Sequence, residues 1–150
     1  MKQLCLLFFI MISVSANSQV YMHDFGSTLI AAHPYTVAPP VMQSNLSGSS
    51  WTNSTGAWTS YAGNTGEAIA ISNSGGSPTI TLTINVAAGY KLNITSFDLW
   101  RQRSATGAQN WSMTINGIAV GSGTIPTTGA AIGTTAVTNP VNNQIGRAHV

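Results

Sequence analysis

A strict alternation of apolar and polar side chains over residues 79–86 is the feature that most constrains the fold. The even positions carry Ile, Leu, Ile and Val, and the odd positions carry Thr or Asn. A period of two places every apolar side chain on one face of an extended strand. We therefore expect a half-buried β-strand here. No stretch of the chain shows a convincing helical period with caps.

A second alternating segment ends in a hairpin signal. Trp111, Met113 and Ile115 share one parity, with Ser and Thr between them. Asn116-Gly117 follows, and this pair favours the type I′ turn because both residues tolerate a positive φ. The sequence thus predicts a hairpin that returns through residues 118–120.

Further strands are expected at residues 20–25, 67–72, 90–103 and 134–141. In residues 90–103 the alternation of apolar side chains changes phase. Leu92 and Ile94 stand at even positions, whereas Phe97 and Leu99 stand at odd positions. A β-bulge near Thr95-Ser96 would reconcile the two halves. Residues 31–66 are rich in Pro, Ser, Asn and Gly, which predicts long loops with short strand pieces.

The amino-acid composition also favours a fold built of β-strands. Charged residues make up 5% of the chain, against roughly 25% in an average soluble protein. Nearly half of residues 19–144 are Ser, Thr, Asn or Gly, which suit strands and turns better than helices. We expect an all-β antiparallel sandwich of jelly-roll type, lacking its last strands. Pro140 weakens residues 134–141 as a central strand.

Both ends of the chain differ from this central segment. Residues 1–18 combine Lys2, a short apolar run and small polar residues, which is typical of a secretory signal peptide. Cleavage after Ser18 is expected, with cleavage after Ala16 as the alternative. Residues 145–150 match the translation of a common sequencing adapter, so we expect a non-native tail. The predicted module is residues 19–144, exported through the Sec pathway to the cell exterior or outer surface.

The predicted module carries no net charge and no cysteine. Without a basic surface, nucleic acid is not an expected partner. The apolar run of the signal segment is far shorter than the ~20 residues of a membrane span. Three cations balance three anions: Lys91, Arg101 and Arg103 against Asp24, Glu67 and Asp98.

Five short aromatic-rich segments carry a family resemblance. They are His23-Asp24-Phe25-Gly26, Ser50-Trp51-Thr52-Asn53, Ala57-Trp58-Thr59-Ser60-Tyr61, Ser96-Phe97-Asp98-Leu99-Trp100-Arg101-Gln102-Arg103 and Trp111-Ser112-Met113-Thr114-Ile115-Asn116-Gly117. Together they resemble the N-terminal β-sandwich modules of large secreted and surface proteins of Bacteroidota-like bacteria. Such proteins often end in a type IX secretion sorting domain. The resemblance implies attachment to a larger protein, with its further domains as partners, and supplies no catalytic motif.

No arrangement of reactive residues predicts an enzyme. The carboxylates Asp24, Glu67 and Asp98 are far apart in sequence, and pairing with Arg101 or a backbone donor is the expected role of the two aspartates. His23 and His33 lack the spacing of a metal site. Nucleophile-elbow, phosphate-loop and metalloprotease motifs are missing from the sequence, so we expect no catalytic residues, cofactor or metal.

Aromatic side chains are the best lead to a function. Trp51, Trp58 and Tyr61 lie in a polar, Gly-rich segment, where they could stack on sugar rings or close one end of the sandwich. Trp100 and Trp111 are expected to pack within the sheets. The stems of Arg101 and Arg103 are expected to cover an apolar face while their heads reach water or an aspartate.

Two functions follow from these observations. The first is a non-catalytic extracellular module of a larger protein, with a structural or presenting role and weak binding to a glycan or cell-surface polymer. The second is the leading fragment of a secreted hydrolase, with its catalytic domain further along the polypeptide. A full-length reading frame would discriminate them.

Overall fold

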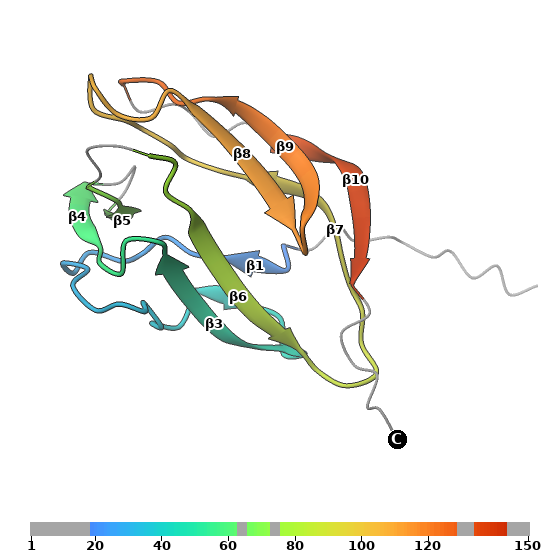
Figure 1. Cartoon of the computed structure of the whole chain (residues 1–150). Helices are drawn as coiled ribbons and strands as arrows, with labels where there is room; N and C mark the ends of the chain where they lie inside the picture. Colours follow the sequence, from blue (N-terminus) through green and yellow to red (C-terminus); the bar gives the residue numbers. More distant parts are fainter. Residues whose placement is uncertain (1–18, 63–65, 73–75, 129–133, 144–150) are drawn as a thin grey trace, which may run out of the picture.

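The computed structural model describes residues 19–62, 66–72, 76–128 and 134–143 (Figure 1). The predicted signal peptide and the predicted tail at residues 145–150 lie outside the described residues. Across the described ranges every regular element is a β-strand. The strands are β1 Tyr21–Met22, β2 Val41–Met42, β3 Leu46–Asn53, β4 Thr59–Ala62, β5 Glu67–Ala70, β6 Ile80–Val86, β7 Leu92–Asp98, β8 Asn110–Ile115, β9 Ile118–Thr124 and β10 Thr134–Asn143.

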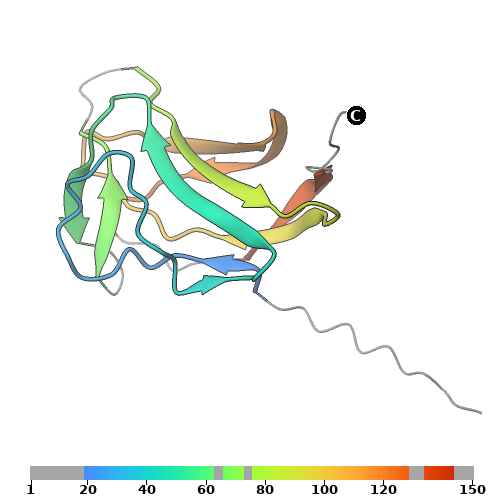
Figure 2. The same ribbon diagram turned by 90° about the horizontal axis from the view of Figure 1, so that it is seen from below.

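These strands pair in antiparallel ladders: β1 with β2, β3 with β6, β4 with β5, β7 with β10 and β8 with β9. β9 also lies alongside β10. In Figures 1 and 2, β7 to β10 gather on one side of the molecule, and β3 and β6 lie on the other. The all-β antiparallel prediction is confirmed, and closure into a jelly-roll sandwich stays a prediction.

The two alternating segments form the expected strands. In β6 the side chains of Leu82, Ile84 and Val86 are wholly or partly buried, and the residues between them are exposed. Ile80 departs from the pattern, because it stands exposed at the strand's start. The hairpin between β8 and β9 turns at Asn116 and Gly117, with φ values of 49° and 80°. These are the left-handed angles that a type I′ turn requires.

β7 is shorter than expected, because it ends at Asp98 instead of continuing to residue 103. Its burial changes phase at Thr95 and Ser96, as predicted: Leu92 and Ile94 are half-buried on one parity and Phe97 on the other. The pairing with β10 is irregular opposite this point, between Ala136 and Val141. Pro140 falls within that irregular stretch, where a missing N–H costs no ladder hydrogen bond.

Residues 31–66 contain a longer strand than predicted. β3 runs for 8 residues and pairs with β6. Its alternation is hidden in the sequence by a bulge, since the register shifts between Ser47 and Ser50. Gly48 adopts a φ of 67° inside that shift, as a bulge residue without a Cβ does readily.

The strand expected at residues 20–25 is also shorter, reaching only Met22. Phe25 and Gly26 have φ values of 60° and 65°, so the extended backbone cannot continue through them. The Asp24 carboxylate accepts a hydrogen bond from the Gly26 N–H at 3.1 Å, which closes the turn locally.

Within the residues that the structure describes, two separate hydrophobic clusters stabilise the fold. We call the first the loop core; its buried members are Ile30, Tyr35 and Trp58, packed by Phe25, Trp51, Ile69 and Ile71. We call the second the strand core; it consists of Val120, packed by Ile94, Phe97, Met113 and Ile115. The strand core joins β7, β8 and β9, whereas the three buried members of the loop core come from segments outside the strands.

Candidate functional site

Trp58 is buried, with 8% of its surface exposed, and it belongs to the loop core. Its ring centre lies 5.6 Å from that of His33. The indole Nε1 is buried and has no hydrogen-bond partner. Both faces of the ring are therefore covered by protein, so Trp58 closes the interior and offers no surface to a sugar.

The side-chain hydrogen bonds of Asn53 explain why Trp58 lies in the interior although its segment is polar and Gly-rich. Its amide donates to the Ala57 carbonyl at 2.7 Å, and its side-chain oxygen accepts from the N–H groups of Thr55 and Gly56. The Thr55 hydroxyl also donates to this oxygen, at 2.7 Å. Asn53 is 8% exposed, so these bonds satisfy a buried amide and shape the turn that carries Trp58 inward.

Trp51 and Tyr61 have different surroundings. Trp51 is half-buried at the margin of the loop core, and its indole N–H donates to the Tyr21 hydroxyl at 2.9 Å. Tyr61, on β4, is 49% exposed. The structure thus brings Trp51 and Trp58 to one cluster and leaves Tyr61 outside it. Loop-core packing covers Trp58 in this structure, so Trp58 and Tyr61 do not share an exposed stacking face, and binding of sugar by Trp51, Trp58 or Tyr61 stays a prediction.

The sequence did not predict an aromatic cluster around His23. Its ring stacks on Phe25 with the centres 4.5 Å apart, and it lies 5.4 Å from Tyr35 and 6.4 Å from both Tyr21 and Trp51. We call these five rings the aromatic cluster. The contacts of His23 with Tyr35 and Trp51 join residues far apart in sequence, and sequence periodicity gives no signal for such contacts.

Both ring nitrogens of His23 are engaged. Nδ1 accepts the Phe25 N–H at 2.9 Å, which leaves Nε2 as the donor to the Val37 carbonyl at 3.2 Å. Burial lowers the pKa of His23 below its usual 6.5, although the Val37 bond and the Asp24 charge both oppose the shift. His23 is therefore a neutral link between the β1 segment and the strap, which we define as residues 34–40.

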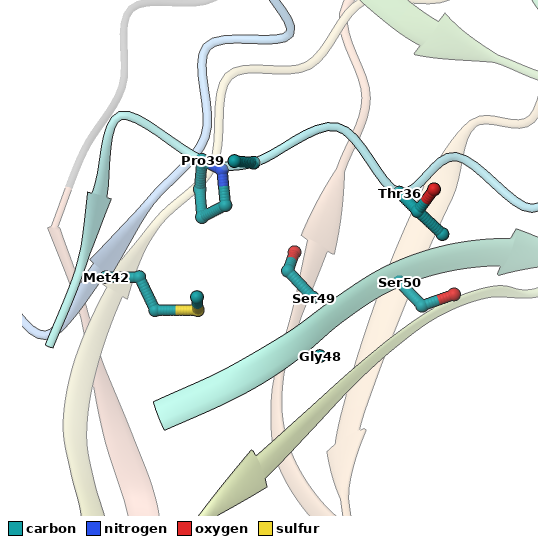
Figure 3. A pocket seen from close by; sticks show the side chains of 7 residues that line it. Thr36, Pro39, Met42, Gly48, Ser49 and Ser50 are labelled. Atoms are coloured by element: carbon teal, nitrogen blue, oxygen red, sulfur yellow. The ribbon is translucent and has the colours of Figure 1, made fainter. Parts of the chain in front are cut away.

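The strap borders a surface groove (Figure 3). At one end the strap pairs with β3, where Tyr35 and Trp51 exchange two backbone hydrogen bonds of 2.9 Å. Pro39 and Pro40 lack N–H groups, so the strap cannot extend this pairing along β3. The groove that remains is about 400 Å³ and is lined by Thr36, Ala38, Pro39, Met42, Gly48, Ser49 and Ser50.

Arg101 and Arg103 bind backbone carbonyls. Arg101 donates to Thr124 at 2.8 Å and lies over the Trp111 ring, 5.7 Å from its centre. Arg103 donates to Ile125 at 2.8 Å and to Ala105 at 2.9 Å. Of the two partners expected for the aspartates, Arg101 or a backbone donor, Asp24 takes a backbone donor, the Gly26 N–H. The arginine bonds join the segment after β7 to the end of β9.

The described residues contain no group of three or more His, Cys, Asp or Glu side chains that could hold a metal ion. Within the same residues, no helix is long and apolar enough to cross a membrane. Comparisons with known protein families, curated proteins and solved structures find no match for this chain.

Proposed function

We propose that the chain is a non-catalytic extracellular β-sandwich module that holds or presents the other parts of a larger secreted or surface protein. The observation that carries the proposal is the engagement of two histidines and two arginines in structural bonds. His23 uses both ring nitrogens, and His33 accepts the Asn53 N–H at 3.0 Å through Nε2. Arg101 and Arg103 hold backbone carbonyls.

These bonds favour a structural role over catalysis. A general base needs a free lone pair within reach of its substrate, and an electrostatic clamp needs donors that point into a site. The imidazoles and guanidinium groups named above instead join segments that lack regular pairing. The secretory pattern at residues 1–18 and the family resemblance support an extracellular place for the module.

Two measurements test the proposal. The full chain, incubated with chromogenic glycosides, esters and peptides, is expected to release no product above the buffer rate. Expressed in a Gram-negative host, it is expected to reach the periplasm with its first 18 residues removed, as intact mass would show. Turnover that is lost on Asp24→Asn or Glu67→Gln substitution would overturn the non-catalytic role, and retention of Met1 in cytoplasmic protein would overturn export.

A further inference from the structure

The groove beside the strap has the chemistry of a small binding site. Its volume of about 400 Å³ falls at the lower end of the range typical of small-molecule pockets. Pro39 and Met42 lie on one side of it, and Ser49 projects toward them from β3 (Figure 3). An apolar surface thus faces hydroxyl groups across a space large enough for one or two rings.

Ser49 is a positioned polar group within this groove. Only 8% of the residue is exposed, and its Oγ lies 2.9 Å from the Tyr21 hydroxyl. Tyr21 already accepts the indole N–H of Trp51 at 2.9 Å. Because a phenol is a stronger donor than an alcohol, the favoured arrangement has Tyr21 donating to Ser49. The Ser49 hydrogen is then available to an acceptor in the groove.

The absence of charged side chains in the groove narrows the class of ligand that it could bind. The seven residues that line the groove carry no ionisable side chain. A charged ligand would lose hydration without gaining a partner there, which is costly. A pyranose ring suits both sides, since its C–H face packs on Pro39 and Met42 and its hydroxyls exchange hydrogen bonds with Ser49 and Thr36.

We propose that this groove binds a neutral saccharide, with Ser49 as its hydrogen-bonding anchor. The site is distinct from Trp58, which is buried, and from Tyr61, which is not among the groove residues. The inference deepens the proposed function, because a presenting module with a glycan site would hold its protein against a polysaccharide.

The test uses amide chemical shifts of the full chain, titrated with neutral methyl glycosides and disaccharides to about 10 mM, as weak sites require. Glucuronate serves as the charged comparison. Ala38→Phe fills the groove from an exposed position, and Val37→Phe adds the same ring to a strap residue that does not line it. Ser49→Ala removes the anchor, with Ser47→Ala, exposed on the same strand, as its control.

A neutral saccharide is expected to shift the amides of residues 36–38, 41–42 and 48–50. Ala38→Phe and Ser49→Ala should each weaken binding at least about tenfold, whereas Val37→Phe and Ser47→Ala should bind as the unaltered chain does. The proposal is overturned if no probe shifts these amides, if the shifts centre on Tyr61, if glucuronate binds equally well, or if Val37→Phe is as harmful as Ala38→Phe. Because turnover and export are measured separately, failure of the groove site is distinguishable from failure of the presenting role.

Discussion

The loop core and the strand core stabilise the same chain by different means. The strand core takes its members from β7, β8 and β9. The β8–β9 ladder fixes the register of Met113 and Ile115 against the strand that carries Val120, and β7 is held by its own ladder with β10. The loop core takes Ile30, Tyr35 and Trp58 from segments outside the strands. There, side chains of His23, His33 and Asn53 form the hydrogen bonds that a ladder would otherwise supply.

This contrast shows how a chain with few charges and many small polar residues can organise irregular segments. Each of these three side chains binds backbone groups, which satisfies buried peptide groups where no neighbouring strand does so. The loop core should therefore be sensitive to the loss of single polar groups. The strand core should respond mainly to changes in side-chain volume.

Removing Trp58 should produce the largest effect. Trp58→Ala leaves a cavity in the loop core, and the free energy of unfolding should fall by about 3–5 kcal/mol. Val120, fully buried in the strand core, gives the matched change: Val120→Ala should cost about 2 kcal/mol, because fewer carbon atoms are removed. Urea denaturation of both variants measures the two values.

A conservative variant tests the role of the Trp58 ring. Its Nε1 has no hydrogen-bond partner, so Trp58→Phe removes part of the volume and no hydrogen bond. The expected cost is about 1 kcal/mol. A loss as large as that of Trp58→Ala would contradict the account, because it would assign the indole N–H a structural bond.

Asn53 should be the most costly polar residue to lose. Asn53→Ala removes the bonds that shape the turn before Trp58, and we expect a loss of about 2 kcal/mol in denaturation experiments. Asn93, exposed on β7, is the control, since Asn93→Ala should change stability by less than about 0.5 kcal/mol. If the two substitutions lowered the free energy of unfolding equally, Asn53 would have no special role in shaping the turn before Trp58.

The sequence predicted the regular strands far better than the loop core. Period-two patterns identified β6 and β8, and the Asn116-Gly117 pair identified the turn, because each signal depends on neighbours in sequence. The contacts of His23 with Val37 and of His33 with Asn53 join residues 14 and 20 positions apart. No local pattern marks such pairs, so the aromatic cluster and the groove were missed.

A glycine on β9 offers a smaller test, made in the β8–β9 ladder beside the strand core. Gly123 faces Trp111 across the β8–β9 ladder, and a Cβ there would lie 2.9 Å from the indole Nε1. Gly123→Ala should therefore displace the ring and cost about 1–2 kcal/mol. Ser122→Ala, at an exposed neighbouring position, should be neutral in the same thermal melts.

Acid should weaken the fold through His23. Because burial lowers the folded-state pKa of His23 below 6.5, the unfolded chain takes up its proton first as the pH falls. Stability is present in full above pH 6.5 and declines below it, until the folded form also protonates. His23→Gln, which cannot titrate, should reduce this decline in melts recorded across the range. An unchanged acid response would assign the effect to other groups.

Residue-resolved amide hydrogen exchange at fixed pH tests the contrast between the two cores most directly. The Phe25 and Asn53 amides donate to His23 and His33, so both should be protected in the unaltered chain. His23→Ala should speed exchange at Phe25, and His33→Ala should speed it at Asn53, while the β8–β9 ladder keeps its protection. Two results would contradict the claim that the two cores are held by different means. One is unchanged exchange at the Phe25 and Asn53 amides, and the other is an acceleration throughout β8 and β9 equal to that at these amides.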